Sequence, residues 1–444
     1  MVGAGGQRPT ANDCRCTLTS PPNRERDRQE RARCKNWVLD CGRNGELNST
    51  VTIRIREAGG SIHCFVAFVL LAMSLVPAGY AQTPAPPKTF ALFGRPTKFI
   101  AAHGVYEFVF HEQRGYSPFD RIGLHRITLG PVPAAHPATV MFYLPGTNMN
   151  GEVAIDDPRH SLPLYMASHG IDFWSLDYRT HFVPASTPPG DLTELQSWTN
   201  EMFEADISAA VRFVLAATQR RQIFLAGFSR GVLFAYLYAA AHPENVKGLV
   251  IFDGSIGHGR RGSPPPGIYA DDVSGKHLTW DKRQALMQLV IDNPTSPAPI
   301  PLFKSAADNL NHVVYDSAGF GGKGGLANPF AGLADPSVLA RVLIRYDRYW
   351  PNVQDYEDSF TPLIAASLMN SRVPVLAFSS TNIAPAWPQE VAKSAASTGS
   401  RDVTIKILHN WGHLDVICGT QAEHQVFEPV LAWLKRQPQQ GVEQ

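Results

Sequence analysis

The sequence has 444 residues, of which 44% are hydrophobic and 18% are charged, so the chain can bury a large core. Its formal net charge is only +1. That value argues against a nucleic-acid partner, because no excess of basic residues exists to displace counterions from phosphate. The composition indicates an ordinary globular protein, and an α/β fold of this length often forms a single unit.

Residues 1–50 differ in composition from the rest of the chain. They are polar and show neither helical nor strand periodicity, so we expect them to be disordered. We hypothesise that translation begins near Val51, since a valine codon can serve as an alternative initiator, and that the residues before it are an artefact of the assumed start. Its cysteines fit no closed zinc pattern and have no nearby histidine, which argues against a metal site. These cysteines are Cys14, Cys16, Cys34 and Cys41.

Residues 51–81 are typical of a signal peptide. Two arginines precede an apolar run over residues 64–76, and Gly79-Tyr80-Ala81 follows as a small-x-small cleavage site. The run is too short to cross a bilayer comfortably, so we expect no stable membrane span after the signal is removed. The sequence therefore predicts a secreted or periplasmic protein. Its mature chain retains only Cys418, which cannot form an internal disulfide.

The pattern after residue 82 predicts alternating strands and helices. Alternating apolar runs at 105–110 and 122–129 predict antiparallel strands at an edge. Helical spacing of apolar residues predicts helices over 201–218 and 426–435. Continuous apolar runs, which suit strands buried on both faces, lie at 140–144, 170–179, 223–226, 246–253, 373–378 and 403–408. This order predicts an α/β fold with a doubly wound, mostly parallel sheet.

The core is predicted to consist of residues 82–254 and 371–444, with an insertion over residues 255–370. A single helix would suffice to connect the strands predicted at 246–253 and 373–378. Because the connection is much longer, we expect the insertion to be a lid or cap. Helices are predicted within it over 281–292 and 337–350. Its aromatic residues would suit an acyl pocket; these are Tyr346, Tyr349, Trp350 and Phe360. The alternative is a surface decoration that does not contact substrate.

The stretch Gly227-Phe228-Ser229-Arg230-Gly231 joins a strand-like run to a segment of helical composition. Gly-x-Ser-x-Gly in that context predicts a nucleophile elbow, where a strained serine rises above the edge of a sheet. The two glycines let strand and helix approach each other. We therefore predict Ser229 as a nucleophile; the alternative is an ordinary glycine-flanked turn.

From about Ala138 to Lys435, the order of elements resembles the α/β-hydrolase superfamily. Three further motifs are similar to that family: Leu144-Pro145-Gly146-Thr147-Asn148, Leu176-Asp177-Tyr178-Arg179, and the histidine loop His409–Ile417. The last of these resembles the acid-lipase branch. The resemblance implies a serine esterase or lipase-like hydrolase.

A serine hydroxyl needs a base within hydrogen-bond reach, and His413 is the predicted base, with His409 in reserve. The oxyanion of the tetrahedral intermediate needs backbone N–H donors. One is expected from Arg230, which follows the nucleophile, and the resemblance assigns the other to Thr147. The family often has His-Gly where this chain has Pro145-Gly146, a change that keeps the backbone donor.

The acidic member of the triad departs from the family pattern. The loop after 373–378 contains no carboxylate, and Asn382 lies near the expected position. We favour Asp253, at the end of the preceding predicted strand, as the acid. Asn382 as an orienting amide remains an alternative, as do Asp358 and Asp415.

These residues together predict an exported serine hydrolase that cleaves a carboxylic ester through an acyl-enzyme on Ser229. The substrate would be a small-molecule or lipid-like ester. One alternative is a peptidase, amidase or acyltransferase that uses the same triad. Another is a non-catalytic binding protein on a hydrolase scaffold. The sequence contains no zinc-protease, phosphate-loop or dinucleotide motif, so we expect no cofactor and no metal.

Overall fold

The computed structural model describes residues 89–256, 268–270, 279–312, 334–351, 353–354 and 367–437, with only the backbone for 268–270. All of these belong to one unit of the chain, Gln82–Gln444. The predicted disordered segment and signal peptide lie outside the described residues.

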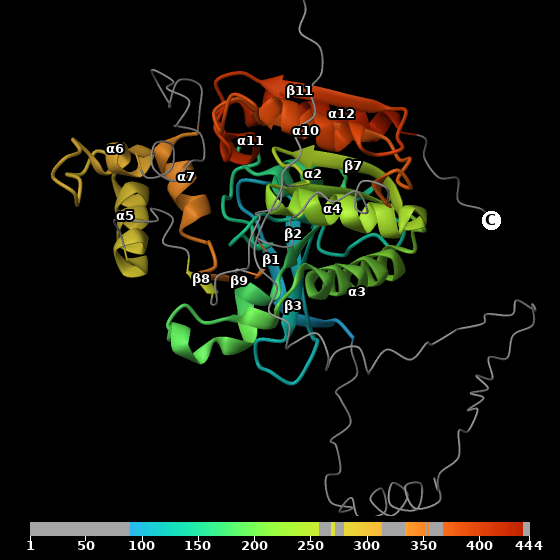
Figure 1. Ribbon diagram of the computed structural model, residues 1–444, viewed down its shortest axis with the longest axis horizontal. Helices are drawn as coiled ribbons and strands as arrows, with labels where there is room; N and C mark the ends of the chain where they lie inside the picture. Colours follow the sequence, from blue (N-terminus) through green and yellow to red (C-terminus); the bar gives the residue numbers. More distant parts are fainter. Residues whose placement is uncertain are drawn as a thin grey trace, which may run out of the picture. The chain divides into compact units, whose positions relative to one another are not determined.

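Nine strands of the described chain form one sheet (Figure 1). Adjacent strands from β5 to β11 pair in parallel, whereas β1, β2 and β3 form an antiparallel edge. The predicted doubly wound, mostly parallel sheet is therefore confirmed. In spatial order the strands are β1 (Ala91–Lys98), β2 (Val105–Gln113), β3 (Arg121–Leu129), β5 (Asp172–Asp177), β4 (Val140–Leu144), β6 (Ile223–Phe228), β7 (Val246–Phe252), β10 (Val375–Ser380) and β11 (Val403–Leu408).

The outermost antiparallel strand, β1, was not among the predicted strands. All eight of its residues are exposed, so it has no buried face to impose an apolar alternation on its sequence. It pairs with β2, and β2 and β3 are therefore interior strands of the sheet and not its edge.

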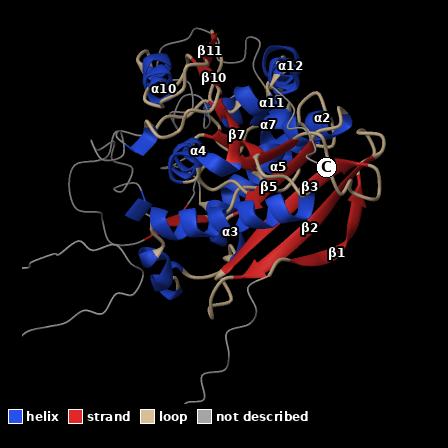
Figure 2. Cartoon of the chain, turned by 90° about the vertical axis from the view of Figure 1, so that its right-hand side faces the viewer, coloured by secondary structure: helices blue, strands red, loops and turns tan. Residues whose placement is uncertain are grey.

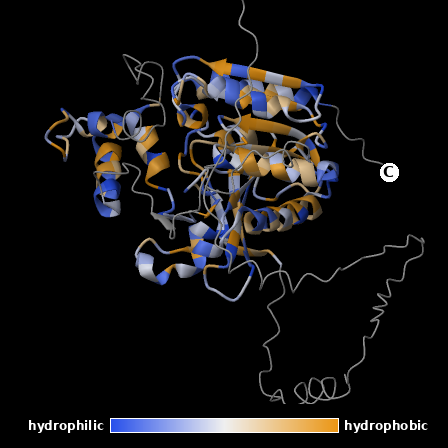
Figure 3. Ribbon diagram, in the orientation of Figure 1, coloured by the Kyte–Doolittle hydropathy of each residue, from blue (hydrophilic) through white to orange (hydrophobic). Residues whose placement is uncertain are grey.

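Helices cover both faces of the sheet (Figure 2). On one face lie α3 (Asn200–Thr218), α4 (Arg230–Ala241) and α10 (Trp387–Ala396), whose buried side chains share one apolar cluster. On the other face lie α2 (Leu162–Ser168), α11 (Asp415–Cys418) and α12 (Glu428–Arg436). A π-helix over Glu423–Phe427 directly precedes α12. Hydrophobic colour runs along most of α4 (Figure 3), as expected for a helix that is buried on several sides.

Short 3-10 helices occupy several connections of the core. Their bounds are η2 (Arg179–Phe182), η3 (Pro189–Asp191), η4 (Thr193–Ser197) and η5 (Pro243–Asn245). The first of these follows the carboxyl end of β5 directly, so it lies at the same edge of the sheet as the loops after β4 and β6.

The described part of the insertion contains α5 (Trp280–Asp292), α6 (Ala306–Asn311), α7 (Pro336–Leu343) and two short strands, β8 (Ile268–Ala270) and β9 (Tyr349–Pro351). The three helices stand together beside the core in Figure 1. The buried guanidinium of Arg283 in α5 joins two of them, because it donates to the carbonyl of Leu343 in α7 at 2.6 Å.

The helix predicted over 337–350 is wrong beyond Leu343. The chain leaves the helix so that Asp347 N–H can donate to the Asn148 carbonyl of the core at 2.7 Å, and β9 then pairs with β8. Trp350 packs edge-to-face on Tyr178 of the core, with ring centroids 5.6 Å apart. Tyr349 and Trp350 thus belong to the buried core cluster and not to an open acyl pocket, and Phe360 lies outside the described residues.

Across the described ranges, no helix combines the length and apolar character needed to cross a membrane.

Candidate active site

Ser229 lies between β6 and α4 in a backbone conformation that side chains rarely adopt, with φ 54° and ψ −120°. The flanking glycines are required by contact. A Cβ on Gly231 would lie 2.0 Å from the Leu144 carbonyl oxygen, and one on Gly227 would lie 2.3 Å from the Gly231 oxygen. The Ser229 N–H donates to the Phe252 carbonyl of β7 at 3.1 Å. The strand–turn–helix geometry is that of a nucleophile elbow.

Asp253 follows the end of β7, beside the elbow, because β6 and β7 are parallel neighbours whose last residues pair as Phe228 and Phe252. Its carboxylate is completely buried, and its Oδ2 lies 2.7 Å from Nδ1 of His413. Three further donors hold that carboxylate in place. They are the Ser380 N–H and Ser380 hydroxyl, both at 2.7 Å, and the Trp387 indole N–H at 2.8 Å.

The imidazole of His413 is held on two sides. Asp253 engages Nδ1, and the Phe228 ring stacks against the imidazole with centroids 4.5 Å apart. Since Phe228 directly precedes Ser229, this stacking keeps the imidazole next to the elbow. The backbone of the histidine loop is held by Asp415, whose Oδ2 accepts the Gly412 N–H at 2.6 Å. His409, the reserve base, is exposed.

Two of the other candidates for the acid, Asn382 and Asp415, are described by the structure and bind other groups. Asn382 is buried, but its N–H donates to the Trp411 carbonyl at 3.1 Å and its Nδ2 has no hydrogen-bond partner among the described residues. Asp415 binds backbone N–H groups, that of Ala334 at 3.0 Å besides that of Gly412. Asp358 lies outside the described residues. Among the described residues, Asp253 is therefore the carboxylate hydrogen-bonded to Nδ1 of His413, and Asn382 does not occupy that position.

The two predicted oxyanion donors lie on segments that touch. Thr147 belongs to the loop after β4, and its hydroxyl accepts a hydrogen bond from Nε of Arg230 at 3.2 Å. A Cβ on Gly146 would lie 2.9 Å from Cβ of Ser229, so this loop lies directly against the nucleophile. The Arg230 guanidinium also lies 5.9 Å from the ring centroid of Trp350, which connects the elbow to the insertion.

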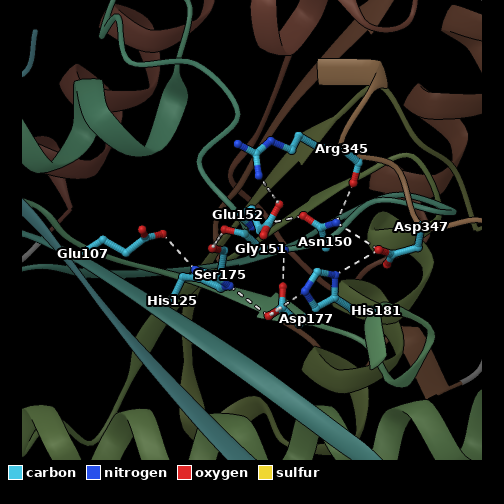
Figure 4. Close-up of polar contacts among 10 residues, drawn as sticks. All are labelled: Glu107, His125, Asn150, Gly151, Glu152, Ser175, Asp177, His181, Arg345 and Asp347. Atoms are coloured by element: carbon cyan, nitrogen blue, oxygen red, sulfur yellow. Dashed lines mark hydrogen bonds and ion pairs between the residues drawn. The ribbon is translucent and has the colours of Figure 1, made fainter. Parts of the chain in front are cut away.

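A second polar cluster, which the sequence reasoning missed as a unit, lies behind the loop after β4 (Figure 4). Asp177, at the end of β5, places Oδ2 2.9 Å from Nε2 of His125 and 3.9 Å from Nε2 of His181. Glu107 lies 2.8 Å from the other nitrogen of His125. One signal was present, because the polar pair His125 and Arg126 stands between the apolar residues Leu124 and Ile127 in β3.

The charges in this cluster support one another. Burial alone would lower the pKa of His125, but the Asp177 charge and hydrogen bonds with Asp177 and Glu107 outweigh it and raise the pKa to about 10. Burial is likewise outweighed at His181, where Asp177 and Asp347 raise the pKa to about 10. Burial would raise the pKa of Asp177, yet the charges of His125 and His181, with hydrogen bonds from His125 and the Gly151 N–H, hold it well below its usual range.

Two cavities adjoin the loop after β4. A cavity of about 80 Å³ has mainly apolar walls, which include Met149, Val342 and Ile417. The other, of about 430 Å³, is bordered by members of the polar cluster, among them His125 and His181. Within the described part of the chain, no group of three or more His, Cys, Asp or Glu side chains is arranged to hold a metal ion.

Among solved structures, a protein from Sulfolobus solfataricus named as a candidate lipase matches 79% of this chain and 99% of its own, with 25% identity and a TM-score of 0.63. A monoacylglycerol lipase from Paleococcus ferrophilus has 13% identity and a TM-score of 0.40, covering 68% of this chain and 96% of its own. A thermophilic esterase from Thermogutta terrifontis has 13% identity and a TM-score of 0.42, covering 73% of this chain and 97% of its own. Of these three, the Sulfolobus structure has a TM-score above 0.5 and supports an argument beyond the fold. No model of a known protein family matches the chain, and no curated protein matches it.

Proposed function

Because the chain is a member of the α/β-hydrolase superfamily by fold, we propose that it is an exported serine hydrolase that cleaves a carboxylic ester through an acyl-enzyme on Ser229. The substrate would be a small-molecule or lipid-like ester. The name of the Sulfolobus structure supports ester cleavage, and the composition of residues 51–81 supports export. The insertion, which contacts Arg230 beside the nucleophile, would act as the lid.

The observation that carries the proposal is the 2.7 Å contact between Asp253 Oδ2 and His413 Nδ1. A buried carboxylate on Nδ1 selects the tautomer whose Nε2 accepts a proton, and it stabilises the imidazolium that forms. The Phe228 ring stacks on the same imidazole and leads directly into the strained Ser229. A binding protein would have no need to maintain a strained serine beside such a pair.

In the proposed reaction, Ser229 Oγ attacks the ester carbonyl carbon while Nε2 of His413 takes the hydroxyl proton. The carbonyl oxygen becomes an oxyanion, which the backbone N–H groups of Arg230 and Thr147 would stabilise. The C–O bond to the alcohol then breaks, and His413 returns the proton to the leaving alcohol. Water, deprotonated by His413, attacks the acyl-enzyme, and the carboxylic acid leaves as Ser229 recovers its proton.

A fluorophosphonate probe and a series of p-nitrophenyl esters test this proposal on the mature protein. We expect covalent labelling and ester cleavage that are both lost in Ser229→Ala, with thermal unfolding unchanged within a few degrees. Absence of labelling in a folded wild-type protein would favour a non-catalytic binding role. Labelling without ester cleavage, but with amide cleavage or acyl transfer to an added alcohol, would contradict the ester assignment while keeping the nucleophile.

Export is tested separately, by N-terminal sequencing of protein recovered from the periplasm or medium. We expect a mature terminus near Gln82. A secreted protein that still contains Cys14 would contradict both the cleavage site and the proposed start near Val51.

A further inference from the structure

The loop that follows β4 is held in place by a buried charge cluster behind it. Asp177, whose side chain is 1% exposed, accepts the Gly151 N–H on Oδ1 at 2.7 Å while its Oδ2 faces His125. The Gly151 carbonyl accepts the Ser175 hydroxyl at 2.6 Å. Both backbone groups of Gly151 are thus bound to side chains of β5. Figure 4 shows Asp177 below Gly151, between the rings of His125 and His181.

No side chain fits at Gly151. A Cβ there would lie 2.8 Å from Cδ2 of His125 and 3.0 Å from the Ser175 hydroxyl oxygen. The end of the loop therefore rests directly on the cluster, with no space for the loop to approach the sheet more closely.

The insertion holds the same loop from the other side. Asp347 N–H donates to the Asn148 carbonyl at 2.7 Å, and the Asn148 amide donates to the Asp347 carbonyl at 2.9 Å. The Asp347 carboxylate lies 2.9 Å from Nδ1 of His181, whose other nitrogen faces Asp177. The Asn150 amide donates to the same carboxylate at 3.1 Å. Asp177 and Asp347, joined through His181, therefore hold Asn148, Asn150 and Gly151.

Thr147 directly precedes this held segment. Asn148 has φ 61°, a left-handed conformation that costs free energy unless its surroundings impose it. The two reciprocal hydrogen bonds with Asp347 supply that constraint. The direction of the Thr147 N–H consequently depends on contacts made several residues further along the chain.

We propose that Asp177 is a positioning residue for the oxyanion site: through Gly151 and His181 it fixes the loop that aims the Thr147 N–H at the reacting carbonyl oxygen. The inference rests on the proposed function. Oxyanion donors act because they are oriented before the reaction, so a loop free to shift would weaken transition-state binding more than substrate binding.

Asp177→Asn tests the inference, and Asp172→Asn is its matched control. Asp172 is at the opposite end of β5, is also buried, and pairs with Arg126 of β3, the strand that carries His125. Both variants remove a buried charge between the same two strands, but only Asp177 contacts the loop after β4. A purely structural role for Asp177 predicts the same kinetic effect from both.

We expect Asp177→Asn to slow fluorophosphonate labelling of Ser229 and kcat for p-nitrophenyl acetate by about 10- to 100-fold, with KM changed less than about twofold. Asp172→Asn should lose a similar amount of thermal stability and stay within about twofold of wild-type labelling. Unchanged labelling in Asp177→Asn, or equal slowing in the two variants, would overturn the inference. A wild-type protein without Ser229-dependent labelling would instead overturn the proposed function, and the inference with it.

His181→Ala provides a second variant should Asp177→Asn fail to fold. His181 borders the cavity of about 430 Å³, through which added imidazole can reach the vacated position. We expect slower labelling that imidazole partly restores, while Asp172→Asn does not respond to imidazole. Labelling of His181→Ala at the wild-type rate would overturn the inference.

Discussion

The Asp253 carboxylate lies 2.7 Å from Nδ1 of His413, although 160 residues separate the two along the chain. Asp253 follows β7 and His413 follows β11, and β10 lies between these strands in the sheet. Ser380, the last residue of β10, binds the Asp253 carboxylate through both its N–H and its hydroxyl, each at 2.7 Å. The proposed acid thus follows β7 and not β10, where the family resemblance would place it, and the end of β10 supports its carboxylate.

Asp253→Asn should lower kcat by up to about 10⁴-fold, because an amide cannot stabilise the imidazolium and favours the wrong tautomer. Asn382→Ala should change kcat by less than about tenfold, because Asp253 and not Asn382 engages Nδ1. Steady-state ester hydrolysis by both variants measures the difference. Near-full activity in Asp253→Asn would contradict the assignment of the acid.

Ser229→Gly should be more stable than Ser229→Ala. Both variants lack the nucleophile, but at φ 54° only glycine relieves the backbone strain. We expect a gain of about 1 kcal/mol in the free energy of unfolding for glycine over alanine. Urea unfolding of the two variants measures it, and equal stabilities would show that the elbow stores no strain at Ser229.

Gly231→Ala should be destabilised by about 3 kcal/mol or more, since its Cβ would lie 2.0 Å from the Leu144 carbonyl oxygen, a backbone atom that cannot give way. Gly190→Ala is the control, because no heavy atom lies within 4 Å of a Cβ there. Thermal unfolding should show a large loss in the first and little change in the second. A wild-type melting temperature in Gly231→Ala would contradict the close approach of α4 to β4.

Stability should fall at alkaline pH because of the polar cluster behind the loop after β4. His125 and His181 have folded-state pKa values raised to about 10. Their contribution is therefore fully present below the unfolded value of about 6.5 and is lost as pH rises through about 10. The groups facing them are Asp177, Glu107, Asp347 and Glu152.

The loss is measured by urea unfolding at pH 7 and pH 10, and we expect it to be on the order of a few kcal/mol. In Asp177→Asn the pH dependence over this range should shrink, because the carboxylate that stabilises both imidazolium ions is gone. Asp172→Asn, which leaves the cluster intact, should keep the wild-type slope. The same slope in all three proteins would contradict a charged cluster.

Much of the fold followed from local patterns. Strands such as β4 and β7 and the helix α3 were predicted nearly to their ends, because continuous apolar runs and helical spacing reflect burial of each element by itself. The exposed strand β1 carried no such pattern. The chain beyond Leu343 was misread as helix because contacts with Asn148 and Tyr178, remote in sequence, override local propensity there.

By itself, the sequence determined the sheet class and the position of the elbow at Ser229, since the elbow depends on five contiguous residues whose glycines are required at fixed spacing. Only the tertiary structure decided that Asp253 and not Asn382 engages His413, and that Asp177 supports the loop carrying Thr147. Those relationships join side chains from different strands, at distances set by strand order and register. Neither strand order nor register can be read from a linear pattern of residues. The sequence could therefore only narrow the candidates for the residue that contacts His413, and the folded chain showed which of the described candidates lies there.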